Sequence, residues 1–325
     1  MKAVILAGGL GTRLRPLTDN LPKPVVPLGN RPFAEYQIDI LKRAGVDEVT
    51  FSLGYQSEKI EQTLGDGGRF GIRLNYMTEP EPLGTAGAFA FANRNSDDSV
   101  FVLNGDILTD VNLEAMIEIH RSREAVATLF LKEVSDPTLY GLVDVDESGK
   151  VTGFREKPSV EEASKIERPL ISAGIYLLEP SVSEMIPPNV KYMFEHDVFP
   201  TLITRGFQVA SYAPECYWRD IGTIENYRLG NIDSMRPPFG DCEKRLIGER
   251  CAIAETAKIS ESVVGDDVRI GELSVVSQSV IQNGSVIGER CRIESSVIGR
   301  DCIIGNGIYL KPGTVVADGT EISER

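Results

Sequence analysis

The stretch KAVILAGGLGTRLRPLT, residues 2–18, decides most of what this chain must fold into. It begins with a short apolar run typical of a buried strand, which ends in two glycines and a loop that carries Arg13. A second cation, Lys23, follows ten residues later inside PKPVVP, residues 22–27. Exposed backbone N–H groups and two cations in a proline-restricted loop suit the oxygens of phosphate. The stretch therefore predicts a strand, a phosphate-binding loop and a polyanionic ligand.

Length and composition narrow the class of protein. The 325 residues, 42% of them hydrophobic, are enough for a full core and favour two domains. A net charge of −14 argues against nucleic acid as a partner, because nucleic-acid binding needs a basic surface. No apolar run reaches the length of a signal-peptide core or a membrane span, and the five cysteines lack CxxC spacing. We therefore expect a reduced, cytoplasmic protein with neither a membrane nor a nucleic acid as partner.

Strand-like and helix-like segments alternate up to about residue 230, which is typical of βαβ units around a mostly parallel sheet. The strand candidates are short runs rich in β-branched or aliphatic residues, at 2–6, 48–53, 72–77, 99–103 and 126–131. Helical patterns lie between them, at 31–44, 56–64, 84–93 and 112–122. A second set of strands is interpreted as an insertion that walls one side of a cleft, near 141–146, 150–155, 171–178 and 207–212. The sequence thus predicts an α/β, Rossmann-like first domain over residues 1–232.

A different period begins after a linker at residues 233–245. Aliphatic residues recur in steps of 6, 6 and 5, at 247, 253, 259, 264, 270, 276, 281, 287, 293, 298, 304 and 310. A helix cannot give this period, whereas short strands coiled around a triangular prism can. Cys251, Cys291 and Cys302 fall at a small inward position of the repeat and are interpreted as buried filler. Residues 246–325 are therefore predicted to form a short parallel β-solenoid, whose ends need capping by the first domain or another subunit.

Two carboxylates follow strands in distant parts of the chain. Asp106 comes directly after the strand VFVLN in the motif NGD, and Asp220 lies in WRDIGT before a helix expected to begin near Ile224. Either aspartate alone would fit a helix cap or a turn. In combination with a phosphate-binding loop, two carboxylates favour a Mg²⁺ site, because Mg²⁺ takes few protein ligands and completes its shell with phosphates and water.

Two further segments leave alternatives open. FREKP, residues 154–158, offers Glu156 to sugar hydroxyls and Lys157 to a phosphate, or forms an exposed charge pair at a strand end. EPEPLGTAGA, residues 79–88, presents backbone groups to a base edge or is simply a rigid loop. The two histidines, at positions 120 and 196, lack metal-ligand spacing and are interpreted as structural.

Taken in order, these segments resemble the sugar-1-phosphate nucleotidyltransferases, also called nucleotide-sugar pyrophosphorylases. The resemblance covers nearly the whole chain, from LAGGLGTRLRPLT through NGD and FREKP to WRDIGT, and the tail resembles the left-handed β-helix of hexapeptide repeats that many members carry. Within the family, EPLGTAGA and the tail are most similar to the mannose-1-phosphate guanylyltransferases. The resemblance implies an enzyme that makes GDP-mannose and pyrophosphate from GTP and mannose 1-phosphate.

The resemblance also implies roles for matching residues. Arg13, Lys23, Asp106 and Asp220 would be catalytic, with the two aspartates on Mg²⁺. The nucleotide would bind to Leu6, Ala7, Gly8, Gly9, Gly11, Thr12, Arg13, Glu79, Gly84 and Thr85. The sugar phosphate would bind to Lys23, Gly141, Glu156, Lys157, Ser172 and Gly174. Many members have Asn where this chain has Ser172, which leaves one sugar-hydroxyl contact, and with it the identity of the sugar, open here.

Other functions compete with this one. A glucose-1-phosphate uridylyl- or thymidylyltransferase would share the motifs, because base and sugar preference depend on a few pocket contacts. A catalytically silent regulatory subunit would be expected to lack loop or metal residues, which are all present here. A solenoid acyltransferase usually relies on a His base, and residues 234–325 contain no His. The open edges and ends of the solenoid favour a homo-oligomer.

Overall fold

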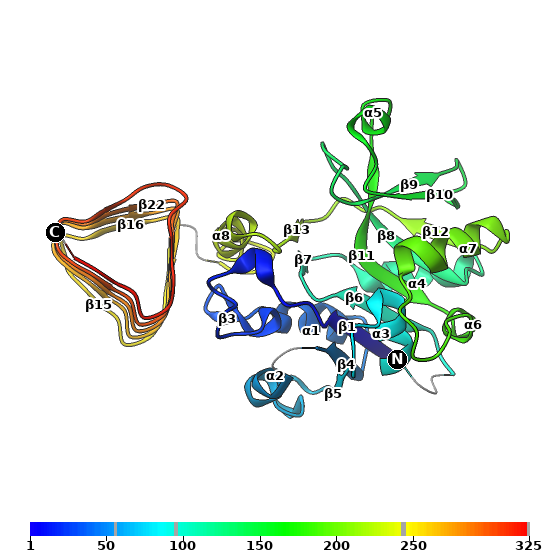
Figure 1. The fold of residues 1–325 in the computed structure, drawn as a ribbon, viewed down its shortest axis with the longest axis horizontal. Helices are drawn as coiled ribbons and strands as arrows, with labels where there is room; N and C mark the ends of the chain where they lie inside the picture. The colour runs from blue at the N-terminus through cyan, green and yellow to red at the C-terminus, as the bar shows by residue number, and fades with distance from the viewer. Residues whose placement is uncertain (55–56, 94–96, 242–244, 324–325) are drawn as a thin grey trace. The chain divides into compact units, whose positions relative to one another are not determined.

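The computed structural model describes residues 1–54, 57–93, 97–241 and 245–323. The chain separates into two compact units, which are drawn in Figure 1. The first comprises Met1–Gly9 and Tyr36–Trp218, and the second comprises Leu10–Glu35 and Arg219–Arg325. The second unit therefore combines a segment near the N-terminus, which begins directly after Gly9, with the C-terminal third of the chain. The division predicted from the sequence, into residues 1–232 and 246–325, follows the change of strand pattern and stays a prediction.

In the described part of the first unit, nine strands form one mixed sheet. They are β1 (Lys2–Ala7), β4 (Glu48–Leu53), β5 (Arg73–Thr78), β6 (Val100–Asn104), β8 (Ala127–Glu133), β9 (Gly141–Val145), β10 (Val151–Glu156), β11 (Leu170–Leu178) and β12 (Val209–Tyr212). Each overlaps a run predicted from the sequence, because burial on both faces of the sheet selects short apolar, β-branched segments. The prediction of an α/β fold with a mixed sheet is confirmed.

The order of the strands creates a switch point beside β1. The sheet runs β10-β9-β11-β6-β1-β4-β5, with β8 against β11 and β12 against β8. β1 is parallel to β4 on one side and to β6 on the other, so the chain first builds outward to β5 and then returns to the opposite side of β1. In open α/β sheets a ligand crevice forms at such a point, beyond the carboxyl ends of the strands.

The strands predicted as an insertion that walls one side of a cleft join the central sheet. β11 is antiparallel to both β6 and β8, with Tyr176 opposite Val102 and Leu129. These strands therefore continue the central sheet, and their role as one wall of a cleft stays a prediction. Residues Ala173 to Leu178 of β11 are buried, as expected for a strand inside a sheet.

Helices connect and cover the strands. They are α1 (Ala34–Arg43), α2 (Ser57–Leu64), α3 (Gly84–Ala92), α4 (Leu113–Ser122), α5 (Val160–Ala163), α6 (Pro180–Glu184), α7 (Phe199–Thr204) and α8 (Ile224–Asp233), with a π-helical turn at Phe194–Val198 and 3₁₀ turns at Thr12–Leu14, Lys23–Val25 and Gly68–Phe70. The four predicted helices correspond to α1–α4, although residue 56 of one prediction lies outside the described residues. Within the described ranges, none of the helices has the length and apolar character that crossing a membrane requires.

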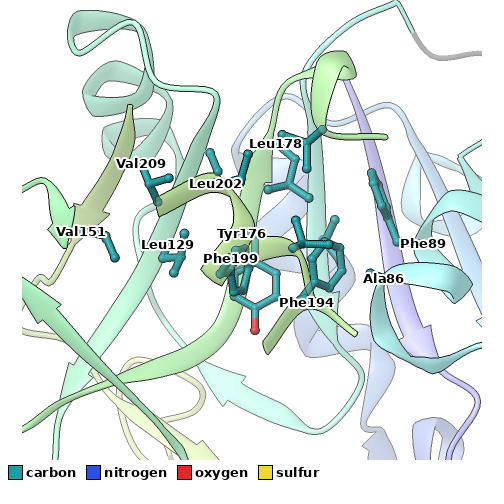
Figure 2. Close-up of a cluster of buried hydrophobic side chains, with 14 of the residues drawn as sticks. Ala86, Phe89, Leu129, Val151, Tyr176, Leu178, Phe194, Phe199, Leu202 and Val209 are labelled. Carbon is teal, nitrogen blue, oxygen red and sulfur yellow. The ribbon is translucent and has the colours of Figure 1, made fainter. Parts of the chain in front are cut away.

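An aromatic cluster fixes the segment around residue 194 against the sheet (Figure 2). The rings of Phe194 and Phe199 stack with centroids 5.4 Å apart, and Tyr176 of β11 meets Phe199 edge-on at 4.8 Å. Each ring removes a large apolar area from water, and these offset geometries are the favourable ones for aromatic pairs. The hydroxyl of Tyr176 points away from the cluster, as Figure 2 shows. The cluster thereby sets the position of that hydroxyl and of Glu195, which follows Phe194.

The C-terminal part of the second unit is a triangular coil of parallel strands, called the β-helix below (Figure 1). One side consists of β14 (Arg245–Ile247), β17 (Ser262–Val264), β20 (Val280–Ile281), β23 (Val297–Ile298) and β26 (Val315–Val316). The next consists of β15 (Ala252–Ile253), β18 (Arg269–Ile270), β21 (Val286–Ile287), β24 (Ile303–Ile304) and β27 (Glu321–Ile322). The third consists of β16 (Lys258–Ser260), β19 (Val275–Ser277), β22 (Arg292–Glu294) and β25 (Tyr309–Leu310).

The inward residues of the β-helix are the predicted aliphatic series. Val264, Ile281 and Ile298 are fully buried and stack in register, one per turn. The next partner of Ile298 is Val316, one residue later than the period of 17 requires, so the repeat contains a single insertion in its last turn. Cys291 and Cys302 are buried in this core, as predicted, and Cys251 packs against it while partly exposed.

The remaining elements are a hairpin, β13 and α8, and β7 of the first unit. The hairpin β2 (Pro27–Leu28) and β3 (Arg31–Pro32) lies in the N-terminal segment. β13 (Trp218–Asp220) precedes α8, and α8 begins at Ile224 as predicted, with the Thr223 hydroxyl accepting the N–H of Asn226 as an N-cap. β7 (Ile107–Thr109) follows Asp106 in the first unit.

Neighbouring isoleucines of β24 offer a test of the β-helix core. Ile304 is 1% exposed and faces inward, whereas Ile303 is 47% exposed and faces outward. We expect Ile304→Ala to lower the free energy of unfolding by about 3 kcal/mol, through lost burial and the cavity it leaves. Ile303→Ala should cost less than about 0.5 kcal/mol. Chemical denaturation of both variants measures the difference, and equal costs would contradict the assignment of the inward face.

Candidate functional site

The ends of β1 and β6 bring two predicted site segments together in the first unit. The N–H of Gly105 donates to the carbonyl of Leu6 at 2.9 Å, so the loop that carries Asp106 lies against the last residues of β1. A Cβ on Gly105 would come within 2.7 Å of that same carbonyl and 3.3 Å of the Ala7 side chain. Only glycine fits this approach. Leu6, Ala7 and Asp106 thus meet at the switch point of the sheet.

Glu79 lies beside the first glycine of the loop. A Cβ on Gly8 would stand 2.9 Å from Glu79 Oε1. The same carboxylate accepts the Ser52 hydroxyl at 3.0 Å and the N–H of Leu83 at 3.0 Å. Glu79 therefore fixes the turn that begins the segment of residues 79–88 next to Gly8. Gly9, the next residue, has open space where a side chain would be.

The first turn of α3 is fixed to the segment around residue 194. Gly84 has φ +74°, and a Cβ there would come within 2.6 Å of the Tyr192 carbonyl. The Thr85 hydroxyl donates to Glu195 Oε2 at 2.8 Å and accepts the N–H of Phe194 at 3.0 Å. The segment predicted to lie near the base is thus rigid, with its Thr85 hydroxyl bonded to Glu195.

The predicted sugar residues of β9 and β10 face each other. Gly141 pairs with Glu156 across the two strands, and a Cβ on Gly141 would lie 3.0 Å from Glu156 Oε2. Lys157 follows in the left-handed region at φ 49°, with its N–H donating to the Tyr140 carbonyl. Its Nζ is 3.9 Å from Glu156 Oε1. A side chain at position 141 would collide first with the Phe154 ring, at 2.5 Å, so glycine is required for the close packing of Phe154 and Glu156 there.

β11 is irregular where Ser172 and Gly174 lie. Its pairing with β8 shifts register between Ser172 and Tyr176, which is the geometry of a β-bulge. Gly174 has φ +78° and lies against the Asn104 amide, which is 2.8 Å from the place of a Cβ. The freed carbonyl of Ala173 accepts the indole N–H of Trp218 at 3.0 Å. Ser172 and Tyr176 exchange a hydrogen bond between hydroxyls at 3.1 Å.

Carboxylates surround the Tyr176 hydroxyl. Burial raises the pKa of Tyr176 most, and the negative charges of Glu195, Glu156 and Asp106 raise it further. The hydroxyl therefore stays protonated and can donate. A region where several carboxylates meet neutral hydroxyls is suited to the many O–H donors of a sugar.

The pKa of Glu156 reports on the same surroundings. Burial raises the pKa of this carboxyl above its ordinary value, and the charge of Glu195 adds to the rise. Lys157 and His196 act in the opposite direction and lower it. Perturbed carboxyl groups of this kind cluster at functional sites. Glu195 is thus part of the group of residues that surrounds Glu156.

The predicted phosphate-binding loop belongs to the second unit from Leu10 onward. Gly11 has φ +61°, its carbonyl accepts the Thr18 hydroxyl at 2.7 Å, and it starts the 3₁₀ turn that contains Thr12 and Arg13. Leu14 in this turn is 1% exposed, while Arg13 is exposed. The turn thus points an apolar side chain into the unit and a cation outward. The other predicted cation, Lys23, begins the 3₁₀ turn Lys23–Val25 between two prolines and is half-buried.

Arg13 and Asp220 lie against the same glycine. A Cβ on Gly222 would be 2.7 Å from Arg13 Nη2 and 2.7 Å from Asp220 Oδ1. The N–H of Gly222 donates to Asp220 Oδ1 at 2.6 Å, which fixes this carboxylate at the start of α8. Two residues far apart in the sequence, Arg13 and Asp220, thus lie against one glycine in the second unit. Asp106 belongs to the first unit.

A divalent metal fits the donor set of the predicted metal residues. Asp106 and Asp220 offer carboxylate oxygens, which are hard ligands, and both side chains are half-buried. Groups of three or more His, Cys, Asp or Glu side chains able to hold a metal do not occur among the described residues. Each carboxylate could supply one hard ligand to a divalent cation that takes its other ligands from phosphate and water.

Sequence reasoning missed Glu195 and Trp218 as site residues. Glu195 contacts Thr85, and Trp218 holds the bulge of β11 and meets the Tyr140 ring edge-on at 5.6 Å. Glu195 lies in KYMFEHDVFP, residues 191–200, which matches no motif with an evident mechanism. Its only signal was a carboxylate between two aromatic residues that turn out to be core, Phe194 and Phe199.

Comparisons with known proteins cover both parts of the chain. Residues 2–234 match the family described as Nucleotidyl transferase, and residues 242–325 match the family described as EIF2B subunit epsilon LbH domain, where LbH denotes a left-handed β-helix. The predicted left-handed β-helix is thereby confirmed.

Individual relatives agree with the family matches. The chain is 37% identical over 236 residues to the mannose-1-phosphate guanylyltransferase of Mycobacterium tuberculosis, a match that covers 72% of this chain. It is 36% identical over 241 residues to the UTP–glucose-1-phosphate uridylyltransferase of Synechocystis sp., over 70% of this chain. The match spans 64% and 61% of the length of these two relatives, less than two thirds of each. A crystal structure of HddC from Yersinia pseudotuberculosis complexed with GMP-PN is 29% identical with a TM-score of 0.60, covering 71% of this chain and 97% of that one.

The charge of Glu195 gives a measurable prediction for Glu156. In Glu195→Gln the like charge is removed while the shape is kept, so the ionised form of Glu156 is stabilised and its pKa falls. Titration of carboxyl groups by NMR in the wild type and the variant measures this shift. The control is Glu161→Gln, an exposed residue of α5, which should leave the pKa of Glu156 unchanged. An unchanged pKa in Glu195→Gln would contradict the placement of Glu195.

Proposed function

Because this chain belongs to the nucleotidyl transferase family, we propose that it condenses a nucleoside triphosphate with a sugar 1-phosphate. The products are a nucleotide sugar and pyrophosphate. The observation that carries the proposal is the placement of Arg13 of the glycine loop and Asp220 of WRDIGT against one residue, Gly222. A cation and a potential metal ligand meet there beside a loop of backbone N–H groups, which is the composition of a phosphate site.

The second unit would bind the phosphates. Gly11 and Thr12 would offer backbone N–H groups to the triphosphate, and Arg13 would pair with its oxygens. Arg13 suits this role because a guanidinium donates two parallel hydrogen bonds to phosphate. Lys23 would lie at the sugar phosphate and the transferring phosphoryl group, where a compact ammonium serves as a point charge.

The first unit would bind the base of the triphosphate and the sugar of the sugar 1-phosphate. Leu6, Ala7, Gly8 and Gly9 continue the nucleotide site along the end of β1. Base recognition would fall to residues near the first turn of α3, namely Glu79, Gly84 and Thr85. The sugar would meet Gly141, Glu156, Lys157, Ser172 and Gly174. Support comes from the carboxylates around Tyr176, since carboxylates accept hydrogen bonds from sugar hydroxyls.

The reaction would be an in-line displacement at phosphorus. A phosphate oxygen of the sugar 1-phosphate forms a bond to the α-phosphorus of the triphosphate, and the bond from that phosphorus to the bridging oxygen of pyrophosphate breaks. The attacking phosphate needs no general base, because its second pKa of about 6 leaves it mostly ionised near neutral pH. The residues of the chain would therefore position the two substrates and offset charge.

Repulsion between the two substrates is the main barrier to their approach. Each pair of unit charges 4 Å apart is worth roughly 4 kcal/mol at an effective dielectric constant of 20. Arg13, Lys23 and Lys157 would supply the opposing positive charge. Nucleotidyltransferases of this family typically use a divalent metal, and we propose Mg²⁺ held by Asp106 and Asp220, which would add positive charge at the phosphates when bound.

GTP and mannose 1-phosphate are the substrates that we propose. The support comes from a relative named mannose-1-phosphate guanylyltransferase and from the HddC structure with GMP-PN. The alternative is a uridylyl- or thymidylyltransferase acting on glucose 1-phosphate, which the Synechocystis relative favours. A silent nucleotide-sugar-binding subunit is disfavoured because Arg13, Lys23, Asp106 and Asp220 are all present.

Assembly into a homo-oligomer through the β-helix remains a prediction from the sequence. Leu273, Ile303 and Tyr309 are large apolar side chains that the β-helix exposes. Exposed apolar groups on a strand coil are consistent with contacts to another subunit.

Removal of either loop cation should suppress turnover. We expect Arg13→Ala and Lys23→Ala each to lower kcat by about 10²-fold or more, as when a charge partner of a transition state is deleted. Arg15→Ala is the matched control, since Arg15 lies in the same loop but pairs with Asp19 on the surface, and it should stay within about twofold of wild type. Steady-state release of pyrophosphate measures all three. Near-normal turnover of Arg13→Ala would remove Arg13 from the site.

A substrate panel tests the proposed reaction itself. Pyrophosphate release is measured with GTP, UTP, dTTP and ATP, each combined with mannose 1-phosphate and with glucose 1-phosphate. We expect the highest kcat/KM for GTP with mannose 1-phosphate. A maximum for UTP or dTTP with glucose 1-phosphate would replace that proposal by the alternative. Binding of a nucleotide sugar without any pyrophosphate release would support the silent subunit instead.

A further inference from the structure

One side of the β-helix is covered by the segment that carries the phosphate loop. Val280 and Val297 point outward from β20 and β23, yet they are only 2% and 1% exposed. They form one buried cluster with Leu14, Leu17 and Val26 of the N-terminal segment and with Tyr227 of α8. Outward residues on the other two sides, such as Ile303 and Tyr309, are about half exposed. We call the covered side, β14-β17-β20-β23-β26, the valine wall.

Buried hydrogen bonds connect the valine wall to the chain that follows Lys23. The Tyr227 hydroxyl donates to the Pro27 carbonyl at 2.5 Å and accepts from Gln282 Nε2 at 3.1 Å. Tyr227 is fully buried and Gln282 is 4% exposed. Asn30 reaches the wall directly, because its side-chain amide donates to the Val264 carbonyl at 2.8 Å. Burial raises the pKa of Tyr227 to about 12, so its hydroxyl keeps the proton that it donates.

The same wall fixes the helix that begins next to Asp220. Arg228 of α8 has a buried side chain that donates to the Gln278 carbonyl at 2.7 Å and pairs with Glu225 at 2.6 Å. Glu225 lies in the first turn of α8, just after Gly222, where Asp220 and Arg13 meet. The β-helix therefore contacts both chain segments that carry the proposed phosphate-binding groups.

We propose that the valine wall is a platform that positions the phosphate loop, and that Tyr227 and Gln282 are positioning residues for Arg13 and Lys23. This inference rests on the proposed function, because the position of Arg13 and Lys23 matters for turnover only if they bind the substrate phosphates. Residues 10–33 contain only short 3₁₀ turns and a two-residue hairpin. Most backbone hydrogen bonds within this segment close single turns, such as the Leu14 N–H to the Gly11 carbonyl, and do not fix the turns relative to one another. A displacement of about 1 Å in charge-bearing groups is enough to lower a rate by about 10²-fold. The platform supplies the missing constraint through burial and through the Gln282–Tyr227–Pro27 hydrogen bonds.

The kinetic test uses variants that remove the hydrogen bonds and keep the volume. Tyr227→Phe and Gln282→Leu are each expected to lower kcat by about tenfold while KM for the triphosphate changes by less than about threefold. The double variant should lose little more than either single one, because residues that act as one unit are not additive. Ile293→Val, in the core of the β-helix away from the valine wall, is the matched control for lost stability and should keep its kcat. All assays are run well below the melting temperature of every variant.

Hydrogen–deuterium exchange provides a readout that does not depend on turnover. In Tyr227→Phe and Gln282→Leu, peptides from residues 10–28 should exchange at least threefold faster than in wild type, while peptides of the central sheet do not change. Ile293→Val should leave residues 10–28 unchanged. Unaltered exchange of this segment in both hydrogen-bond variants, or equal kcat losses in the control, would overturn the platform. If the two variants exchange faster but the wild type releases no pyrophosphate with any substrate pair, the proposed function is refuted and the platform stands.

Discussion

The packing of Leu14 and Leu17 on the valine wall is the contact on which the proposed site depends. A loop that presents backbone N–H groups and cations to a ligand cannot spend those groups on holding its own shape. Fixing each residue of such a loop costs about 1–2 kcal/mol of conformational entropy. Burial of one face offsets that cost and leaves the other face available. In the 3₁₀ turn Thr12–Leu14 this division is complete within three residues, with Leu14 buried and Arg13 exposed.

Charge is distributed between the units in a way that suits the phosphate and sugar groups of the proposed substrates. The second unit supplies Arg13 and Lys23 in the loop, while the first unit gathers Asp106, Glu156 and Glu195 around the Tyr176 hydroxyl. Carboxylates would repel a phosphate but accept hydrogen bonds from a sugar. A protein with a net charge of −14 can therefore bind polyanions, because only the local charge at the phosphates has to be positive.

The parts of the fold that the sequence predicts are those encoded by repetition. The alternation of strands and helices and the aliphatic series of the β-helix depend on local period, and both are confirmed. The packing of the N-terminal segment on the valine wall could not be predicted from a local period. Val280 and Val297 look like ordinary outward residues, and Leu14, Leu17 and Val26 lie in a proline-rich stretch without period. Contacts between residues so far apart in the sequence cannot be predicted from a local pattern. The contact between Thr85 and Glu195 could not be predicted for the same reason.

If Ser172 lines the proposed sugar site, position 172 would allow sugar selectivity to change while the fold does not. Ser172 lies in the bulge of β11, where the backbone is fixed by the Trp218 bond to Ala173 and by Gly174 against Asn104. The Ser172 hydroxyl bonds to Tyr176, whose ring is locked in the aromatic cluster (Figure 2). With Asn at this position, as the family resemblance implies for many members, an amide with two donors and one acceptor group would replace a short hydroxyl that is already paired. In the proposed sugar site, the rigid bulge would transmit this difference to the ligand, so a single side chain there would alter which sugar hydroxyls find partners.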